Sequence, residues 1–143
     1  MTKIDFYQIE SEEPALHFTC RLIDKIYHQG HQIYVNTADQ TQAHELDDLL
    51  WSFRAERFVP HAIAELEEDA PVLISHQATP DDNQEVLVNL APVVPDFFSR
   101  FVRVAEVVPL DEAHRAAARE NYKFYKERGY VLEYHKMQGN KNR

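Results

Sequence analysis

Short apolar segments with strand character alternate with longer segments of helical periodicity along this chain, and this alternation constrains the fold most. The predicted strands, rich in β-branched and aromatic residues, are residues 4–9, 31–37, 70–76, 84–90, 102–108 and 130–134. The predicted helices are residues 11–30, 38–53 and 110–129, with a short one at 95–101. Strands that alternate with helices favour an α/β fold in three layers, with a mostly parallel sheet flanked by helices.

Local signals mark the ends of the first and last helices. Ser11 is a candidate N-cap, and Pro14 suits a first helical turn. Gly30 and Gly129 suit the left-handed residue that commonly ends a helix. Residues 135–143 are expected to form a frayed tail after the last strand.

Length and composition favour one domain. A chain of 143 residues can bury a core without disulfides or metals, and it shows no linker or repeat, so a single domain over 1–143 is expected. The lone Cys20 fits a reducing compartment. No run approaches the roughly 18 apolar residues of a membrane helix, and the N-terminus lacks the pattern of a signal peptide. We therefore expect a cytoplasmic protein.

The glycines argue against a nucleotide site, although a strand followed by a helix invites one. The chain has only Gly30, Gly129 and Gly139, and none lies between the first strand and the first helix. That loop, residues 10–15, is "ESEEPA", whose carboxylates would repel a phosphate. The expected fold is therefore Rossmann-like but lacks the nucleotide-binding glycine loop.

Catalytic and metal-binding patterns are weak. The eight histidines are scattered, no HExxH motif occurs and there is no second cysteine, so no metal or other cofactor is expected. Cys20 falls on the apolar stripe of the first helix, which favours a packed thiol over a nucleophile. A small α/β enzyme with an unrecognised acid/base site stays open as the alternative. Such an enzyme should have a pocket at the carboxyl ends of the strands, lined by ionisable side chains.

The last helix carries cations and an aromatic ring on one face. Arg115, Arg119, Tyr122 and Lys126 follow at spacings of four, three and four residues. Net charge is −9, but residues 101–143 hold 9 Lys and Arg against 6 Asp and Glu. Arginine could hold a carboxylate while an apolar group rests on the Tyr ring. A merely solvated amphipathic helix, or a helix that binds nucleic acid directly, fits the same pattern.

The only tryptophan indicates a second surface. Trp51 lies off the apolar stripe of the helix over 38–53, close in sequence to Phe58 and to arginines. An off-stripe Trp in this setting suits a protein-protein anchor. A second layer of core packing is the other interpretation, and burial of both aromatic side chains would favour it.

Three segments resemble the chi subunit family of bacterial DNA polymerase III. They are "FYQI" at 6–9, "LDDLLWSFRAERFVPH" at 46–61 and "VVPLDEAHRAAARENYKFYKERGY" at 107–130. The resemblance implies a Rossmann-like fold that uses no nucleotide. It also implies a non-catalytic clamp-loader accessory subunit, which bridges the psi subunit and the acidic C-terminal tail of single-stranded DNA-binding protein and reaches DNA only indirectly.

The resemblance also implies site residues, position by position. Trp51 and Phe58 resemble residues that contact psi, and the same patch is implied for a helicase partner in some bacteria. The residues Val108, Arg115, Arg119 and Tyr122 resemble the pocket for the acidic tail. Arg115 takes a position where a lysine can occur in the family, so the geometry of its contact with a carboxylate can differ. For an adaptor of this kind, the pocket is expected beside the last helix and not at the carboxyl ends of the strands.

Overall fold

One sheet of parallel strands organises the protein. The computed structural model describes residues 2–53, 58–66, 69–76 and 85–138. Within these residues the seven-stranded sheet has the order β3-β4-β2-β5-β6-β1-β7, and every neighbouring pair is parallel. The strands are β1 (Lys3–Ile9), β2 (Ile33–Asn36), β3 (His61–Ile63), β4 (Val72–Ser75), β5 (Val86–Asn89), β6 (Arg103–Val108) and β7 (Val131–Met137).

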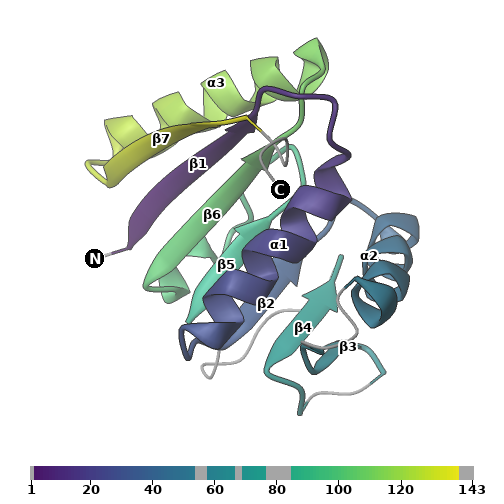
Figure 1. The fold of residues 1–143 in the computed structure, drawn as a ribbon. Coiled ribbons are helices and arrows are strands. Elements are labelled where there is room, and N and C mark those ends of the chain that lie inside the picture. Colours follow the sequence, from purple (N-terminus) through teal and green to yellow (C-terminus); the bar gives the residue numbers. More distant parts are fainter. Residues whose placement is uncertain (1, 54–57, 67–68, 77–84, 139–143) are drawn as a thin grey trace.

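Helices cover both faces of this sheet (Figure 1). The helical elements are α1 (Ala15–His28), α2 (Gln40–Ser52), the short 3-10 helix η2 (Phe98–Arg100) and α3 (Glu112–Glu127). Side chains of α1 and α2 pack in one apolar cluster, and those of α3 and η2 pack in another. The expected three-layer α/β fold, with the sheet between two helical layers, is therefore confirmed.

The alternation of side chains along each strand produces the two cores. In β1, Tyr7 and Ile9 point to the α1 side, whereas Ile4 and Phe6 point to the α3 side. Cys20 is fully buried in the α1 core. Burial raises the pKa of its thiol to about 12, as expected for a packed cysteine and not a nucleophile.

The helix boundaries confirm some of the local signals and correct others. Gly30 and Gly129 follow α1 and α3 with φ of 98° and 83°, the left-handed conformation expected of them. Ser11 does not cap α1: Pro14 occupies the N-cap, and the Ser11 hydroxyl instead accepts from the Glu13 backbone N–H. The capping prediction for Ser11 was wrong because two residues, Glu12 and Glu13, lie between it and the N-cap Pro14, which leaves it too far from the first turn.

Two strands differ from the sequence-based expectation. The three-residue strand β3 was not predicted, because so short a segment shows no periodicity. β7 continues to Met137, three residues beyond the predicted end at Tyr134, so residues 135–137 of the expected tail belong to the sheet. The reason is pairing: β1 matches β7 residue by residue from Lys3 to Ile9. Residues 139–143 lie outside the described part of the chain.

Candidate functional site

A cavity of about 590 Å³ lies between α3 and the strands β1 and β7. We call it the α3 cavity; it is lined by Gln8, Arg115, Arg119, Tyr122, Tyr134 and Lys136. The helical spacing of Arg115, Arg119 and Tyr122 places all three on one face of α3. The strands supply the opposite wall, where Gln8 of β1 pairs with Lys136 of β7. Three cations and two tyrosine rings therefore border one hollow.

The two arginines of the α3 cavity are held by the chain's own acceptors. Arg115 is partly buried, and its Nη2 donates to the Ile9 carbonyl at 2.9 Å and to Glu10 at 3.1 Å. Its Nε is buried and has no hydrogen-bond partner in the described structure. Arg119 is 63% exposed and donates to Glu112 at 2.6 Å. An ion pair so exposed contributes little, so an incoming carboxylate can replace it.

A series of hydrogen bonds leads from Arg115 through Glu10 to the strand residues Gln8 and Tyr134 that line the α3 cavity. Gln8 donates to Glu10 at 2.5 Å, and the Tyr134 hydroxyl donates to the Gln8 side-chain oxygen. The hydrogen bond from Gln8, together with the charge of Arg115, lowers the pKa of Glu10. Glu10 is therefore an ionised internal competitor for any acidic ligand that approaches Arg115.

Aromatic rings form the apolar part of the cavity lining. Tyr122 lies 5.5 Å from Phe6 and 6.0 Å from Tyr134 between ring centroids, and Phe6 stacks on Tyr134 at 5.5 Å. Phe6 is fully buried, so it holds the two tyrosines in place from below. The tyrosines present both a ring face and a hydroxyl to the α3 cavity.

Val108 is placed differently from the other predicted members of this pocket. It lies at the end of β6, is only 3% exposed and packs in the α3-side core. It pairs with Gln8, which does line the cavity. In the free protein Val108 therefore supports the wall from within the core and does not line the cavity.

Sequence reasoning missed three of the residues that line the α3 cavity, and besides Val108 one residue of the predicted helix face lies outside it. Gln8, Tyr134 and Lys136 come from β1 and β7, and no helical spacing connects them to α3. The alternation of Tyr134 and Lys136 on one strand face was the available signal. Lys126 shares the predicted helix face but does not line the cavity.

Trp51 and Phe58 form an exposed aromatic pair at the end of α2. Their side chains are 60% and 43% exposed, and their rings stack with centroids 5.1 Å apart. His61 is buried behind them, 5.0 Å from the Trp51 ring. The His61 ring nitrogens lie 2.7 Å and 3.2 Å from the carbonyl oxygens of Val59 and Asp47. The pair is thus an exposed apolar surface that packs on the buried His61 ring, and it does not form a second core layer.

At the carboxyl ends of the central strands, the described residues form a buried polar row. Ser75, Asn36, Asn89 and Glu106 occupy paired positions on β4, β2, β5 and β6. Asn36 donates to Asn89 at 2.9 Å, and Asn89 donates to Glu106 at 3.1 Å. Tyr125 of α3 covers the row and donates to Glu106 at 2.6 Å. Ser75 donates instead to Glu65 at 2.6 Å, and the other groups satisfy one another, so the row is typical of a buried structural network.

Glu106 is the titratable side chain of this row, and its pKa is strongly shifted. Burial raises its pKa to about 7, and the hydrogen bonds from Tyr125 and Asn89 offset only part of that effect. A raised carboxyl pKa is typical of catalytic acids. Here the group is closed off from solvent, so that shift alone does not indicate an active site.

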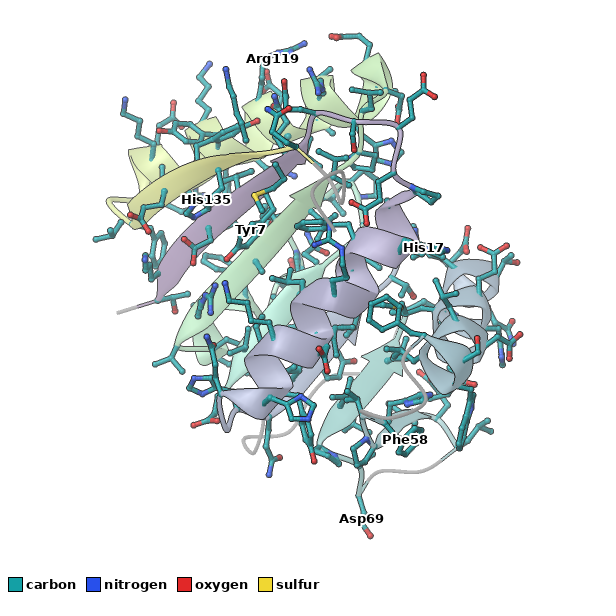
Figure 2. All side chains as sticks on the ribbon, viewed as in Figure 1. Tyr7, His17, Phe58, Asp69, Arg119 and His135 are labelled. Carbon is teal, nitrogen blue, oxygen red and sulfur yellow. The ribbon has the colours of Figure 1, made fainter. Side chains whose placement is uncertain are left out.

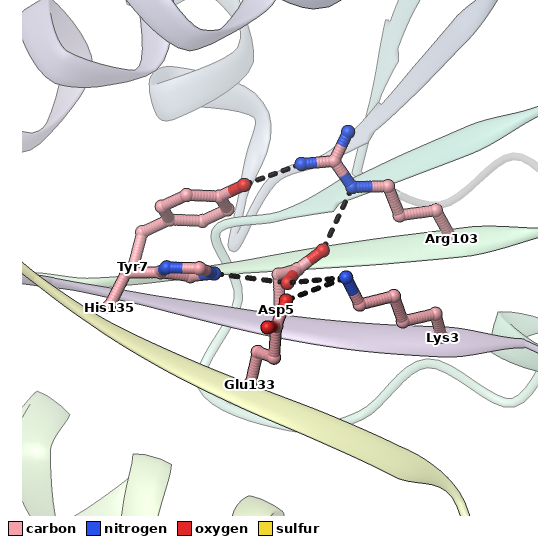
Figure 3. A network of polar contacts seen from close by, with 6 residues as sticks. All are labelled: Lys3, Asp5, Tyr7, Arg103, Glu133 and His135. Carbon is pink, nitrogen blue, oxygen red and sulfur yellow. Dashed lines mark hydrogen bonds and ion pairs between the residues drawn. The ribbon is translucent and has the colours of Figure 1, made fainter.

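A second ionisable cluster lies on the other face of β1 and β7 (Figure 3). Asp5 accepts from Arg103 at 2.9 Å and lies 3.1 Å from His135 and 3.7 Å from Lys3. Burial opposes ionisation of Asp5, but the hydrogen bonds from His135 and Arg103 outweigh it and lower its pKa. Ligand atoms of Asp5, Glu133 and His135 lie within 4.8 Å of one another, the geometry of a possible metal site. The cations Arg103 and Lys3 already neutralise these carboxylates and would repel a divalent ion.

Comparison with known proteins identifies the family of this chain. A model of the family described as "DNA polymerase III chi subunit, HolC" matches residues 1–133. The chain belongs to this chi subunit family. It is 44% identical over 139 residues to the DNA polymerase III subunit chi of Pseudomonas aeruginosa, covering 96% of this chain and 98% of that one.

Two more distant relatives carry the same name. The chi subunit of Escherichia coli K12 is 32% identical over 116 residues, which cover 79% of each chain. That of Haemophilus influenzae is 30% identical over 116 residues, covering 79% of this chain and 81% of the relative. The family match includes every residue of the aromatic pair and all the helical residues of the α3 cavity. Membership in the chi family places the protein among the DNA polymerase III subunits that serve DNA replication.

In the described part of this chi family member, no helix is both long and apolar enough to cross a membrane.

Proposed function

We propose that this protein is a non-catalytic adaptor of the DNA polymerase III holoenzyme. It bridges the psi subunit of the clamp loader and the acidic C-terminal tail of single-stranded DNA-binding protein. Membership in the chi family supports its place in the replicase. The observation that carries the adaptor role is the α3 cavity, where cations and aromatic rings converge on one hollow. The adaptor would act in the cytoplasm as one domain, without a cofactor.

The α3 cavity has the chemistry that an acidic peptide with an aromatic terminus requires. Arg119 is exposed, and among the described residues its guanidinium pairs with the surface carboxylate of Glu112. Arg115 has a buried Nε without a partner, which a small side-chain shift toward a ligand carboxylate would satisfy. Tyr122 supplies a ring face for an apolar side chain. Val108 enters this proposal as support for the wall.

The aromatic pair, Trp51 and Phe58, supplies the second contact. A stacked and exposed Trp-Phe pair is the kind of anchor that dominates protein-protein interfaces. We assign it to the psi subunit, and to a helicase as an alternative occupant of the same patch. The protein would then reach DNA only through its partners.

The alternative of a small α/β enzyme has one feature in its favour, the raised pKa of Glu106. Its carboxylate is buried and already bound to Tyr125 and Asn89. The described cavity beside α3 instead lies where an adaptor is expected to have one. Direct binding of nucleic acid would require an extended basic surface, whereas the net charge of −9 discourages contact with phosphates.

The adaptor proposal is tested first by the binding of a labelled acidic peptide ending in Asp-Ile-Pro-Phe. We expect micromolar-range binding by the wild type, and binding at least about tenfold weaker for Arg119→Ala, which corresponds to about 1.4 kcal/mol. Arg128→Ala is the matched control, because Arg128 ends the same helix but packs on the Phe124 ring outside the cavity.

The two possible failures have different meanings. Equal binding by wild type and Arg119→Ala would remove the acidic-tail site from the α3 cavity. Steep salt-dependent binding of single-stranded DNA by the protein alone would instead favour the nucleic-acid alternative.

A further inference from the structure

A groove of about 690 Å³ separates the first turn of α1 from α2 and belongs to neither proposed contact. Leu16 of α1 and Leu49 of α2 provide its apolar lining. Both side chains are only partly buried, and both pack on the core beneath the two helices. His17, labelled in Figure 2, belongs to the α1 wall. The groove therefore offers apolar surface that the free protein leaves accessible.

The rim of this groove is acidic. Glu45 and Asp48 line its α2 wall and are exposed. Neither takes part in an ion pair with another described residue. The two segments that form the groove walls, residues 10–20 and 38–53, contain no lysine or arginine. The groove thus has an apolar floor under an acidic rim, and no described lysine or arginine pairs with the rim carboxylates.

The groove leads to the aromatic pair. Gln42, Glu45, Leu49 and Ser52 line it at spacings of three and four residues, one stripe along α2. This stripe is about 15 Å long at about 1.5 Å per residue. Asp48, which lines the groove, lies three residues before Trp51, about one helical turn away on the same side of α2. A ligand segment seated on the aromatic pair can therefore continue directly into the groove.

We propose that this groove receives a basic amphipathic segment of the protein that docks on the aromatic pair. The inference rests on the proposed function, because it names the chemistry of that partner. Apolar side chains of the segment would cover Leu16 and Leu49, and its lysines or arginines would face Glu45 and Asp48. The same acidic rim repels an acidic tail. Charge then sorts the two partners, basic to the groove and acidic to the α3 cavity.

The test measures binding of purified psi subunit from the same organism to the wild type and to three variants at low and high salt. Glu45→Lys/Asp48→Lys reverses the groove rim, and we expect it to weaken binding at least about tenfold at low salt, with a smaller loss at high salt. Glu120→Lys/Glu127→Lys is the control, because it makes the same charge change on the exposed side of α3. Trp51→Ala reports on the aromatic pair itself.

The outcomes separate this inference from the proposed function. If Trp51→Ala loses binding and the rim reversal matches its control, psi docks on the aromatic pair but the groove inference is overturned. If Trp51→Ala binds as the wild type does, the proposed psi contact fails as well. Hydrogen exchange gives a check without substitutions: psi should protect backbone amides of residues 15–18, in the first turn of α1. Unchanged exchange there would contradict the inference.

Discussion

One buried residue, Glu106, gives the stability of this protein a dependence on pH. Its pKa is raised to about 7 because burial disfavours the carboxylate. Between the usual pKa of 4.5 and about 7, the folded state keeps a proton that the unfolded state has released. The contribution of Glu106 to stability is therefore fully present below pH 4.5 and is lost as pH rises to about 7.

Glu106→Gln should remove the loss of stability that Glu106 causes as the pH rises from 4.5 to about 7. We expect the wild type to lose about 2 to 3 kcal/mol of unfolding free energy from this group between pH 5 and pH 8, and the variant to lose much less. Urea denaturation of both proteins at the two pH values measures the difference. Asp5 does not interfere, because its pKa is lowered from 3.8 and it titrates below this range. Parallel pH profiles for the two proteins would show that the buried row does not titrate as we infer.

At the scale of elements, α2 positions the aromatic pair, and the N-terminus of this helix is capped by side chains. α2 carries Trp51 near its C-terminal end, and its N-terminus begins at Asp39, whose side chain accepts from the Gln42 backbone N–H at 2.8 Å. The Gln42 side chain in turn accepts from the Ala38 backbone N–H at 2.8 Å. This reciprocal pair resembles a capping box and satisfies two N–H groups that the helix cannot.

Asp39→Ala should destabilise the protein by about 1 kcal/mol, because the Gln42 N–H loses its acceptor. Asp39→Asn should be nearly neutral, since asparagine caps a helix as well as aspartate does. The midpoint of chemical denaturation of both variants against wild type provides the measurement. A loss as large in Asp39→Asn as in Asp39→Ala would attribute the effect to charge and not to the cap.

At the scale of the whole molecule, the two contact surfaces lie at opposite ends of the sheet. Phe58 precedes β3, one edge strand, and Arg119 lies on α3 near β7, the other edge strand. Figure 2 shows the two side chains far apart, with the sheet between them. This separation would allow both proposed partners to bind one copy of the protein at once, as the proposed adaptor role requires.

Independence of the two sites is therefore expected. Saturating psi should change the dissociation constant of the acidic peptide by less than about twofold, because no described contact joins the two surfaces. Fluorescence anisotropy of the labelled peptide, with and without psi, checks this. Trp51→Ala should leave peptide binding intact, and Arg119→Ala should leave psi binding intact. Mutually exclusive binding would contradict the bridging role.

The periodicity of apolar residues predicted most of the helices and strands, but it did not predict the order of the strands in the sheet. The alternation of strands and helices, the missing glycine loop, the exposed Trp51 and the face shared by Arg115, Arg119 and Tyr122 are all local patterns of sequence. The strand β3 and the last residues of β7 were missed because pairing with β4 and β1 forms them, not their own periodicity.

The sequence by itself determined which residues share a helix or strand face, because side chains repeat at 3.6 residues in a helix and at 2 in a strand. It also determined, through similar segments, the family. Only the tertiary structure brought Gln8 and Lys136 to the α3 cavity, buried Val108 beneath it and sealed Glu106 behind Tyr125. These placements depend on strand order and helix packing, which arise from contacts between segments distant in the sequence, such as β1 with β6 and β7, and leave no local pattern.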